Sequence, residues 1–463
     1  MAKISINLAT GTLQKAEIIV GIDLGASNSL IAFIDPDRNP KVINDTGKGH
    51  LMPSIVHFDA AGVPLIGNEA RALLIIDAAN TFLSQKALLG RPENELPQNQ
   101  VYKPLQVTTE ILKELKKRAE HALKTPVNKA VVTVPSYFTD SQRMATRNAG
   151  RLAGLDVIKI VNETTAASLT YGIGLDPMDQ KTIAVYDLGG GSFTVSVMRI
   201  HNGIFEVLST KGNSFPGGND FDRTILNYWI DKNNLDAAST EATPSLMQQL
   251  RLKAEEAKIA LSTQNLYNEK LGEIWCTLDR QTFEQLIAAM VTDTINLCKQ
   301  AIADAKLTTA AIDEVLLVGG STRMPYVKAQ VTELFGKQPN EQINPDEIVA
   351  LGAAIQADIM DGNRSFISLP DEDMYKEPAP SSAAAQRMLD QARAEGEQLA
   401  YLAGQFIERH RFVLTSMDIS GTREILDKLR AALSQDDTDM IRSLTTELNE
   451  FTRPFASRLL KPS

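Results

Sequence analysis

Residues 20–28 and 185–193 share one pattern: they read Val-Gly-Ile-Asp-Leu-Gly-Ala-Ser-Asn and Val-Tyr-Asp-Leu-Gly-Gly-Gly-Ser-Phe. Each begins with β-forming residues and continues through Asp-Leu-Gly into small residues. A strand that ends in Asp and turns through Gly places a carboxylate beside a row of backbone N–H groups, which together can hold a metal ion and a phosphate. One such turn is more often structural than functional. Two copies predict duplicated halves.

The two turns are expected to clamp a triphosphate from opposite sides. The residues that would contact it are Gly25, Ser27 and Asn28 on the first turn and Gly189, Gly190 and Ser192 on the second.

A third turn follows an apolar strand, where Val315–Val318 leads into Gly319-Gly320-Ser321-Thr322-Arg323-Met324-Pro325. Such a strand-to-helix junction lets the backbone approach a nucleobase or sugar, and the flat guanidinium of Arg323 can stack on a purine. Taken alone, a plain turn with a surface arginine explains this segment equally well.

The composition favours a globular protein outside the nucleic-acid-binding and membrane classes. The chain has 463 residues, 43% of them hydrophobic, and a net charge of -10, which is the wrong sign for a general phosphate-backbone binder. Cys276 and Cys298 have no metal-ligand spacing around them, which favours a reducing compartment. No stretch resembles a signal peptide or reaches the roughly 18 apolar residues of a membrane span. We therefore expect a cytoplasmic location.

Strand and helix patterns alternate up to about Ala357, which predicts an α/β domain over 1–360. The segment 361–380 is rich in Asp, Glu, Pro and Ser and reads as a linker. The tail, 381–463, has apolar residues at helical spacing and predicts a bundle of three amphipathic helices. These residues are Leu399, Leu402, Phe406, Ile407, Ile425, Leu429, Leu433, Ile441, Leu444, Leu448 and Phe451.

Together these segments resemble the DnaK-type, seventy-kilodalton heat-shock chaperones. The resemblance covers nearly all of residues 18–357 and rests on motifs that occur in the family's order. They are Gly21–Gly25, Val132–Pro135 with Tyr137-Phe138, Asn162-Glu163, Asp187–Gly191, Gly217-Gly218 with Asp220–Asp222, and Gly319–Pro325. The N-terminal stretch also resembles the branch specialised for iron–sulfur cluster assembly. The family implies an actin-like fold of two lobes around an ATP site.

Carried over residue by residue, the resemblance assigns roles at this site. Asp23 and Asp187 would hold Mg²⁺, Lys86 and Glu163 would position the attacking water, and Ser192 stands where the family has a threonine hydroxyl near the γ-phosphate. The nucleoside would be held by Glu255, Lys258, Ser262, Gly319, Gly320, Ser321, Arg323 and Asp346. Without the surrounding motifs, we would interpret Lys86 and Glu255 as solvent-exposed helix residues.

This chain departs from the family pattern at four positions near the site. Ala26 and Thr194 replace a threonine and an aspartate, and Thr164 and Asn219 replace a proline and a glutamate. Nucleotide binding should survive these changes better than hydrolysis, because backbone donors hold the phosphates whereas carboxylates position metal and water.

Two longer departures concern whole segments. The upper subdomain near 90–111 should be reduced, and no strand-rich segment follows Ala357 to form the family's peptide-binding β-sandwich. Groove-type peptide binding is therefore not expected. Segment 365–369 only faintly resembles the family's apolar linker strand. Pro135 and Arg143 match residues that relay the ATP state in the family, although ordinary packing and a surface arginine explain them equally well.

Three functions remain open at this point. The first is a chaperone-like ATPase with slow, Mg²⁺-dependent hydrolysis coupled to lobe closure, with a co-chaperone or nucleotide-exchange protein as partner. The second is a hydrolysis-deficient nucleotide sensor that regulates a chaperone or another partner, which Thr194 favours. The third, an actin-like filament or sugar kinase, does not explain the context of Pro135, Glu163 and Gly319–Pro325.

Overall fold

The computed structural model describes residues 4–6, 13–15, 17–44, 49–83, 85–91, 96, 102–172, 180–201, 204–213, 216–235, 244–340, 342–361 and parts of 393–452. The chain divides into two compact units, Met1–Pro370 and Asp371–Ser463. The expected linker 361–380 lies outside the described residues except for Asp361, and so does most of the segment 92–101 within the expected reduced subdomain.

The first unit contains two large sheets. The first sheet has the order β11-β10-β3-β4-β5, with β6 paired to β4. Its strands are β3 (Ile19–Asp23), β4 (Asn28–Ile34), β5 (Pro40–Val42), β6 (Met52–Pro53), β10 (Lys129–Val134) and β11 (Asp156–Asn162). Strands β3, β10 and β11 are parallel, whereas β4 runs antiparallel to β3.

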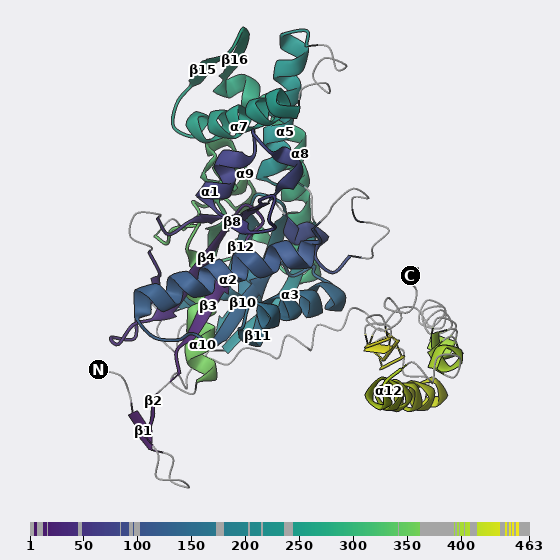
Figure 1. Cartoon of the computed structure of the whole chain (residues 1–463). Helices are drawn as coiled ribbons and strands as arrows, with labels where there is room; N and C mark the ends of the chain where they lie inside the picture. Colours follow the sequence, from purple (N-terminus) through teal and green to yellow (C-terminus); the bar gives the residue numbers. More distant parts are fainter. Residues whose placement is uncertain are drawn as a thin grey trace. The chain divides into compact units, whose positions relative to one another are not determined.

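Helices α2 (Pro104–Leu123) and α3 (Asp140–Leu152) cover one face of this sheet (Figure 1). Proline at the start of α2 suits a position whose N–H has no partner within the helix. Thr139 caps α3 by accepting a hydrogen bond from the backbone N–H of Gln142. Alternate residues of the strands, such as Val20 and Val132, pack against Leu112 of α2 and Ala149 of α3. We call this assembly the first lobe.

The second sheet has the order β14-β13-β12-β17. Its strands are β12 (Gln180–Leu188), β13 (Phe193–His201), β14 (Ile204–Asn213) and β17 (Glu314–Val318). Helices α5 (Gly218–Lys232), α8 (Arg280–Asp304) and α9 (Pro325–Phe335) share a core with it, which includes Tyr186, Trp229 and Val291. We call this assembly the second lobe.

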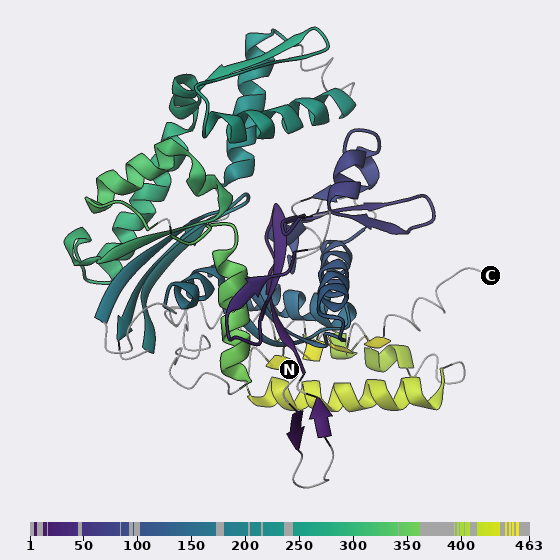
Figure 2. The same cartoon turned by 90° about the vertical axis from the view of Figure 1, so that its left-hand side faces the viewer.

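Helices α4 (Glu163–Gly172) and α10 (Ile348–Met360) lie between the two sheets. Their residues Leu169 and Ala353 share one core with Val131 of the first sheet and Val185 of the second. Figure 2 shows α10, in green, running between the strands of the two lobes.

The two lobes repeat one arrangement. In each, an antiparallel hairpin carries an Asp-Leu-Gly turn, β3–β4 in the first lobe and β12–β13 in the second. In each, a further strand runs parallel beside the first strand of the hairpin, β10 beside β3 and β17 beside β12. The predicted α/β class and the predicted duplication are both confirmed.

Smaller elements extend each lobe. The first lobe carries a sheet of β7 (Ile55–Phe58), β8 (Pro64–Ile66) and β9 (Thr81–Leu83), with α1 (Asn68–Leu73) and the short helices η1 (Ala78–Asn80) and η2 (Gln85–Leu88). The second carries α7 (Pro244–Leu261), β15 (Leu266–Leu271) and β16 (Ile274–Asp279), together with η4 (Thr309–Ala311) and η5 (Gly320–Arg323). A separate hairpin joins β1 (Ile4–Ile6) to β2 (Leu13–Lys15).

The second unit is helical where it is described. Helix α12 (Ser416–Gln435) buries Ile425 and Leu429 against Ile407, Ile441 and Leu448, which come from helical residues on either side in the sequence. This agrees with the predicted helical bundle. Of the residues expected in its core, Leu402 lies outside the described part of the chain.

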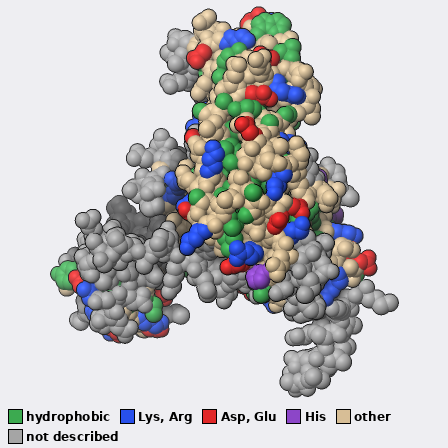
Figure 3. All heavy atoms as spheres, turned by 180° about the vertical axis from the view of Figure 1, so that it is seen from behind, with side chains coloured by type: hydrophobic (Ala, Val, Ile, Leu, Met, Phe, Trp, Pro, Cys, Tyr) green, Lys and Arg blue, Asp and Glu red, His purple; other side chains and the backbone are tan. Residues whose placement is uncertain are grey.

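Charges are mixed on the molecular surface. On the face shown in Figure 3, Lys and Arg side chains alternate with Asp and Glu instead of gathering into one basic area. Within the described part of the chain, none of the helices combines the length and the apolar character needed to span a bilayer.

Candidate functional site

A cleft lies where the two Asp-Leu-Gly turns face each other. It is lined by all of the residues predicted for the phosphate and metal end of the site: Asp23, Gly25, Ser27, Asn28, Lys86, Glu163, Asp187, Gly189, Gly190 and Ser192. It also contacts three residues of the predicted nucleoside end, Gly319, Gly320 and Asp346. Residues more than 300 positions apart in the chain therefore share one concave surface.

The two turns approach each other so closely at Gly190 that a side chain there would meet the first turn. A Cβ atom at Gly190 would overlap the Ser27 hydroxyl of the first turn. A Cβ atom at Gly217 would lie 2.7 Å from both the Ser192 nitrogen and the Gly190 carbonyl oxygen. Gly217 was quoted above only as part of a motif. Its part in supporting the second turn depends on a contact that no sequence spacing reveals.

Acidic groups gather at the base of the cleft, where Asp187 and Glu163 are buried and Asp23 is partly buried. The Thr133 hydroxyl donates a hydrogen bond of 3.0 Å to Asp23, and Lys86 forms an ion pair with Glu163. Lys86 and Glu163 are each only 8% exposed, so this pair is largely shielded from water. The Lys86 ammonium also lies 5.9 Å from the centre of the Phe138 ring.

The pKa values of both turn aspartates are raised. Burial, followed by the charge of Glu163, raises the pKa of Asp23 to about 7, while Lys86 and Thr133 oppose the shift. Burial, then the charges of Glu163 and Asp23, raises the pKa of Asp187 well above its usual range. Carboxylates that repel each other in a buried cleft are the expected neighbours of a cation.

The donor set fits Mg²⁺. In the described ranges, no group of three or more His, Cys, Asp or Glu side chains is arranged to bind a metal. Mg²⁺, however, usually takes one or two carboxylates, keeps several waters and shares substrate phosphates. Asp23 and Asp187 meet that requirement.

Thr194 and Ser192 differ in their surroundings. Burial raises the pKa of the Tyr137 phenol, and a side-chain hydrogen bond with Ser192 opposes that shift. Thr194 pairs with Asp187 across β12 and β13 and is 2% exposed, and its hydroxyl makes no hydrogen bond to any described residue. Thr194 therefore lies beside the site without lining it.

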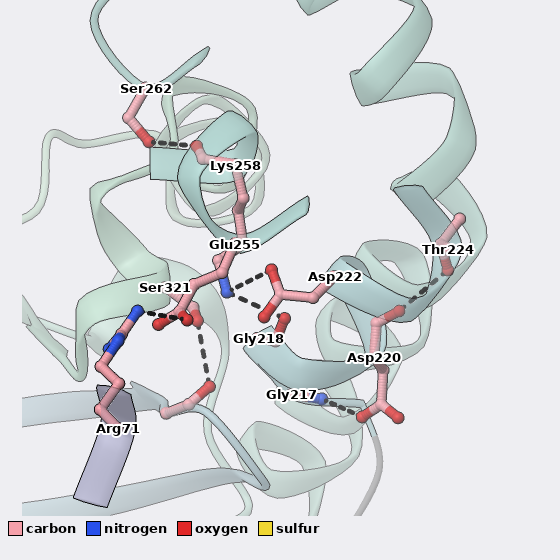
Figure 4. A network of polar contacts seen from close by, with 11 residues as sticks. Arg71, Gly217, Gly218, Asp220, Asp222, Thr224, Glu255, Lys258, Ser262 and Ser321 are labelled. Atoms are coloured by element: carbon pink, nitrogen blue, oxygen red, sulfur yellow. Dashed lines mark hydrogen bonds and ion pairs between the residues drawn. The ribbon is translucent and has the colours of Figure 1, made fainter. Parts of the chain in front are cut away.

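The remaining predicted nucleoside residues are bonded to protein groups, and Figure 4 shows Glu255, Lys258, Ser262 and Ser321 among them. Glu255 accepts a hydrogen bond of 2.7 Å from Arg71, and Lys258 pairs with Asp222 at 2.8 Å. The Lys258 ammonium also donates to the Gly218 carbonyl at 3.0 Å. These residues do not line the cleft as the structure has it. Arg71 and Asp222 were not predicted, because nothing in their spacing links them to α7.

The other three predicted nucleoside residues, Ser262, Ser321 and Arg323, also bond to protein groups. Ser262 donates to the Lys258 carbonyl at 3.3 Å, within its own helical segment, and Ser321 donates to the Gly189 carbonyl of the second turn at 3.0 Å. Arg323 forms an ion pair of 2.6 Å with Asp346. Arg323 is thus held beside the cleft by Asp346, which lines it.

Arg143 is neither a free surface arginine nor a simple packing residue. It donates to the carbonyl oxygens of Ser136 and Phe138, at 3.4 and 3.2 Å, and to the Asn162 side chain at 2.7 Å. The loop that it holds contributes Pro135, Tyr137 and Phe138 to the cleft wall. Arg143 therefore connects that wall to the residue before Glu163.

The duplicated hairpins, the helices between them and the shared cleft define the class of two-lobed, actin-like folds. A family model described as Hsp70 protein matches residues 19–98 and 93–376. The chain belongs to the Hsp70 family.

Relatives support this assignment. The Chaperone protein HscA homolog of Acinetobacter baumannii (strain ATCC 17978) is 42% identical over 373 residues, covering 76% of this chain and 59% of that protein. The Chaperone protein DnaK of Thermosipho melanesiensis is 41% identical over 360 residues, covering 75% and 60%. The Heat shock protein hsp-6 of Caenorhabditis elegans is 40% identical over 388 residues, covering 76% and 59%. The matched part of the chain thus spans about three fifths of the length of these relatives.

Proposed function

We propose that this chain binds Mg·ATP in the cleft and hydrolyses it slowly, with the two lobes closing on the nucleotide, as part of a chaperone-like activity. One observation carries the proposal: two Asp-Leu-Gly turns face each other beside the buried Lys86–Glu163 pair. Family membership supports it, because relatives over the same region include proteins named as chaperones.

The residues divide into three groups by chemistry. The backbone N–H groups of the two turns, with Ser27, Asn28 and Ser192, would hold the phosphates. Asp23 and Asp187 would hold Mg²⁺, which when bound neutralises developing phosphate charge. Glu163, oriented by Lys86, would accept a hydrogen bond from the attacking water and place it in line with the leaving group.

The nucleoside end requires rearrangement on binding. Gly319 and Gly320 already line the cleft, and Arg323 and Asp346 border it. For Glu255, Lys258 and Ser262 to contact an adenosine, Glu255 would have to bind Arg71 and the ligand together, and Lys258 would have to bind Asp222 and the ligand together. Lobe closure or opening offers a movement that would bring the ligand within reach of these groups.

Binding and hydrolysis need separate experiments. Calorimetry with ATP and ADP, with and without Mg²⁺, tests binding, and single-turnover kinetics tests hydrolysis. Asp187→Ala and Gly320→Trp should each weaken binding at least about tenfold, because one removes a metal ligand and the other fills the cleft. Asp231→Ala, a change on α5 outside the cleft, is the matched control. Saturable binding unaffected by the first two variants would contradict the site assignment.

A hydrolysis-deficient nucleotide sensor remains the second candidate. Thr194 favours it, because a neutral hydroxyl stands where the family pattern has a carboxylate. Tight Mg·ATP binding without measurable single turnover would support the sensor over the ATPase. A co-chaperone or nucleotide-exchange partner, the cytoplasmic location and the iron–sulfur branch stay predictions.

A further inference from the structure

A chain of buried hydroxyl groups connects α4 to the second sheet beside the cleft. The Thr164 hydroxyl lies 2.8 Å from that of Ser196 on β13, and the Ser196 hydroxyl lies 2.9 Å from that of Thr210 on β14. A longer contact of 3.4 Å joins Thr164 to Ser136, in the loop that lines the cleft. Thr164 and Ser196 are 1% and 0% exposed, so water cannot replace either partner.

This series of hydroxyl groups begins at Thr164, directly beside Glu163. Glu163 and Thr164 are the first two residues of α4, which follows β11 without a loop. The first turn of α4 is fixed further by Ser168, whose hydroxyl donates to the Thr164 carbonyl at 2.8 Å. A shift of the Thr164 side chain therefore moves the backbone that carries the Glu163 carboxylate.

The other end of the hydrogen bond belongs to the second Asp-Leu-Gly hairpin. Ser196 lies on β13, the strand that leaves the turn at Ser192, and pairs with Val185 two residues before Asp187. The Thr164–Ser196 bond thus links the residue after Glu163, on the helix between the two sheets, to the hairpin of the second lobe that carries Asp187 and leads from Ser192. Hydrogen bonds in a chain strengthen one another where the local dielectric is low, and the Thr164–Ser196 bond is the buried one of this chain.

We propose that the Thr164 hydroxyl is a positioning group that sets the distance between Glu163 and the second phosphate turn. This inference rests on the proposed function. The Thr164 hydroxyl regulates that site because it makes the packing of α4 on β13 depend on what occupies the cleft. A proline, which the family pattern has at this position, has no hydroxyl and cannot form the link.

The test compares Thr164→Val with wild type in single-turnover hydrolysis at saturating Mg·ATP. We expect the rate to fall about 2- to 10-fold, the range for losing one neutral hydrogen bond that acts at the transition state. The Mg·ATP dissociation constant should stay within about twofold. Thr164→Ser should restore the rate because it keeps the hydroxyl. Thr164→Pro should behave like Thr164→Val, because the first turn of a helix tolerates proline.

The matched control is Thr165→Val. Thr165 neighbours Thr164 on α4 and is 2% exposed, but it takes no part in the hydroxyl chain. A general loss of packing would slow both variants equally, whereas a positioning role slows only Thr164→Val. A double variant, Thr164→Val with Ser196→Ala, should be no slower than Thr164→Val alone if the Thr164–Ser196 bond carries the effect, since both changes remove that bond and the Ser196–Thr210 bond lies outside the link to Glu163.

A second measurement does not depend on turnover. Hydrogen exchange of the α4 and β13 amides should slow when Mg·ATP binds to wild type, and this protection should be lost in Thr164→Val and kept in Thr165→Val. The inference is overturned if Thr164→Val matches Thr165→Val in both rate and protection. Failure of wild type to bind Mg·ATP in calorimetry would refute the proposed function itself, and the inference with it.

Discussion

Thr194 stands directly opposite Asp187 in the register of β12 and β13, and its buried hydroxyl lacks a hydrogen-bond partner in the described part of the chain. Opposite residues of an antiparallel pair point to the same face of a sheet, so the two side chains are neighbours. An unsatisfied buried hydroxyl typically costs about 1 to 3 kcal/mol. The position therefore carries a polar group whose partner is missing.

We expect Thr194→Asp to accelerate hydrolysis. A carboxylate there would accept hydrogen bonds from metal-bound water more strongly than a neutral hydroxyl. If that contact contributes about 1.5 to 3 kcal/mol at the transition state, the single-turnover rate should rise roughly 10- to 100-fold. Rates of both proteins at saturating Mg·ATP provide the measurement. An unchanged or slower variant would mean that the missing carboxylate does not limit turnover.

Thr194→Val is the matched control for that substitution. It removes the unpaired hydroxyl while keeping the shape, so the free energy of unfolding should stay the same or rise by up to about 1 kcal/mol. Its hydrolysis rate should remain at the wild-type level. A large loss of stability would show that the Thr194 hydroxyl does have a partner.

The Lys86–Glu163 pair should show strong coupling in a double-mutant cycle. Removing either charge leaves the other buried and unpaired, so Lys86→Met and Glu163→Gln should each destabilise the protein by about 3 to 5 kcal/mol. The double variant should lose less than the sum, because neither Lys86 nor Glu163 is then left as the unpaired member of the pair. Urea unfolding measures all four proteins. The exposed pair Lys428–Glu424 in α12 is the control and should show coupling below about 1 kcal/mol.

The position of the two Asp-Leu-Gly turns at strand ends was predictable because its signal is local. Asp23 and Asp187 follow β-branched runs and precede glycines, so chain order alone placed both carboxylates at strand ends. The face of Thr194 was predictable as well, since side chains alternate along a strand. The duplication of the fold followed from the repetition of the same nine-residue pattern.

The contacts between distant elements could not be predicted in this way. Glu255 and Lys258 have the right spacing to share one helix face, but their partners Arg71 and Asp222 are chosen by tertiary packing. The Thr164–Ser196 bond joins residues that carry no pattern in the sequence. The sequence alone left Arg143 as either a residue that relays the ATP state or an ordinary surface arginine, because its three hydrogen-bond acceptors come from tertiary packing.

Metal-free protein should lose stability as the pH rises. Asp23 has a pKa of about 7 in the folded protein and about 3.9 in an unfolded chain, so the folded state binds more protons between these values. The contribution of Asp23 to the free energy of unfolding therefore falls from about pH 4 to about pH 7 and levels off above. Urea unfolding in the presence of a chelator measures this dependence.

The contribution of Asp23 is isolated by comparison with Asp23→Asn. The difference in unfolding free energy between wild type and variant should decrease through the same pH window, since only wild type titrates there. Saturating Mg·ATP should flatten the dependence of wild type, because a bound cation favours the charged carboxylate. A difference that grows with pH would contradict the raised pKa.

Arg71 and Glu255 join α1 of the first lobe to α7 of the second, so their hydrogen bond of 2.7 Å should slow nucleotide release by restraining the lobes. Their side chains are 36% and 28% exposed, which limits such a pair to about 0.2 to 1 kcal/mol. Arg71→Ala should therefore speed the dissociation of a fluorescent ADP by about 1.5- to 5-fold in stopped-flow measurements at low salt.

The pair Lys181–Glu314 is the matched control, because its side chains are similarly exposed, at 34% and 30%, but lie on β12 and β17 of a single sheet. Lys181→Ala should leave ADP release unchanged, and the effect of Arg71→Ala should shrink in 1 M salt as exposed charges are screened.

Glu255→Ala separates two roles for the Glu255 carboxylate. If Glu255 only restrains the lobes, its variant should match Arg71→Ala, and the double variant should release ADP no faster than either. If Glu255 also contacts the adenosine, its variant should release ADP faster than Arg71→Ala. Release from Arg71→Ala at the wild-type rate would show that this contact does not restrain the lobes.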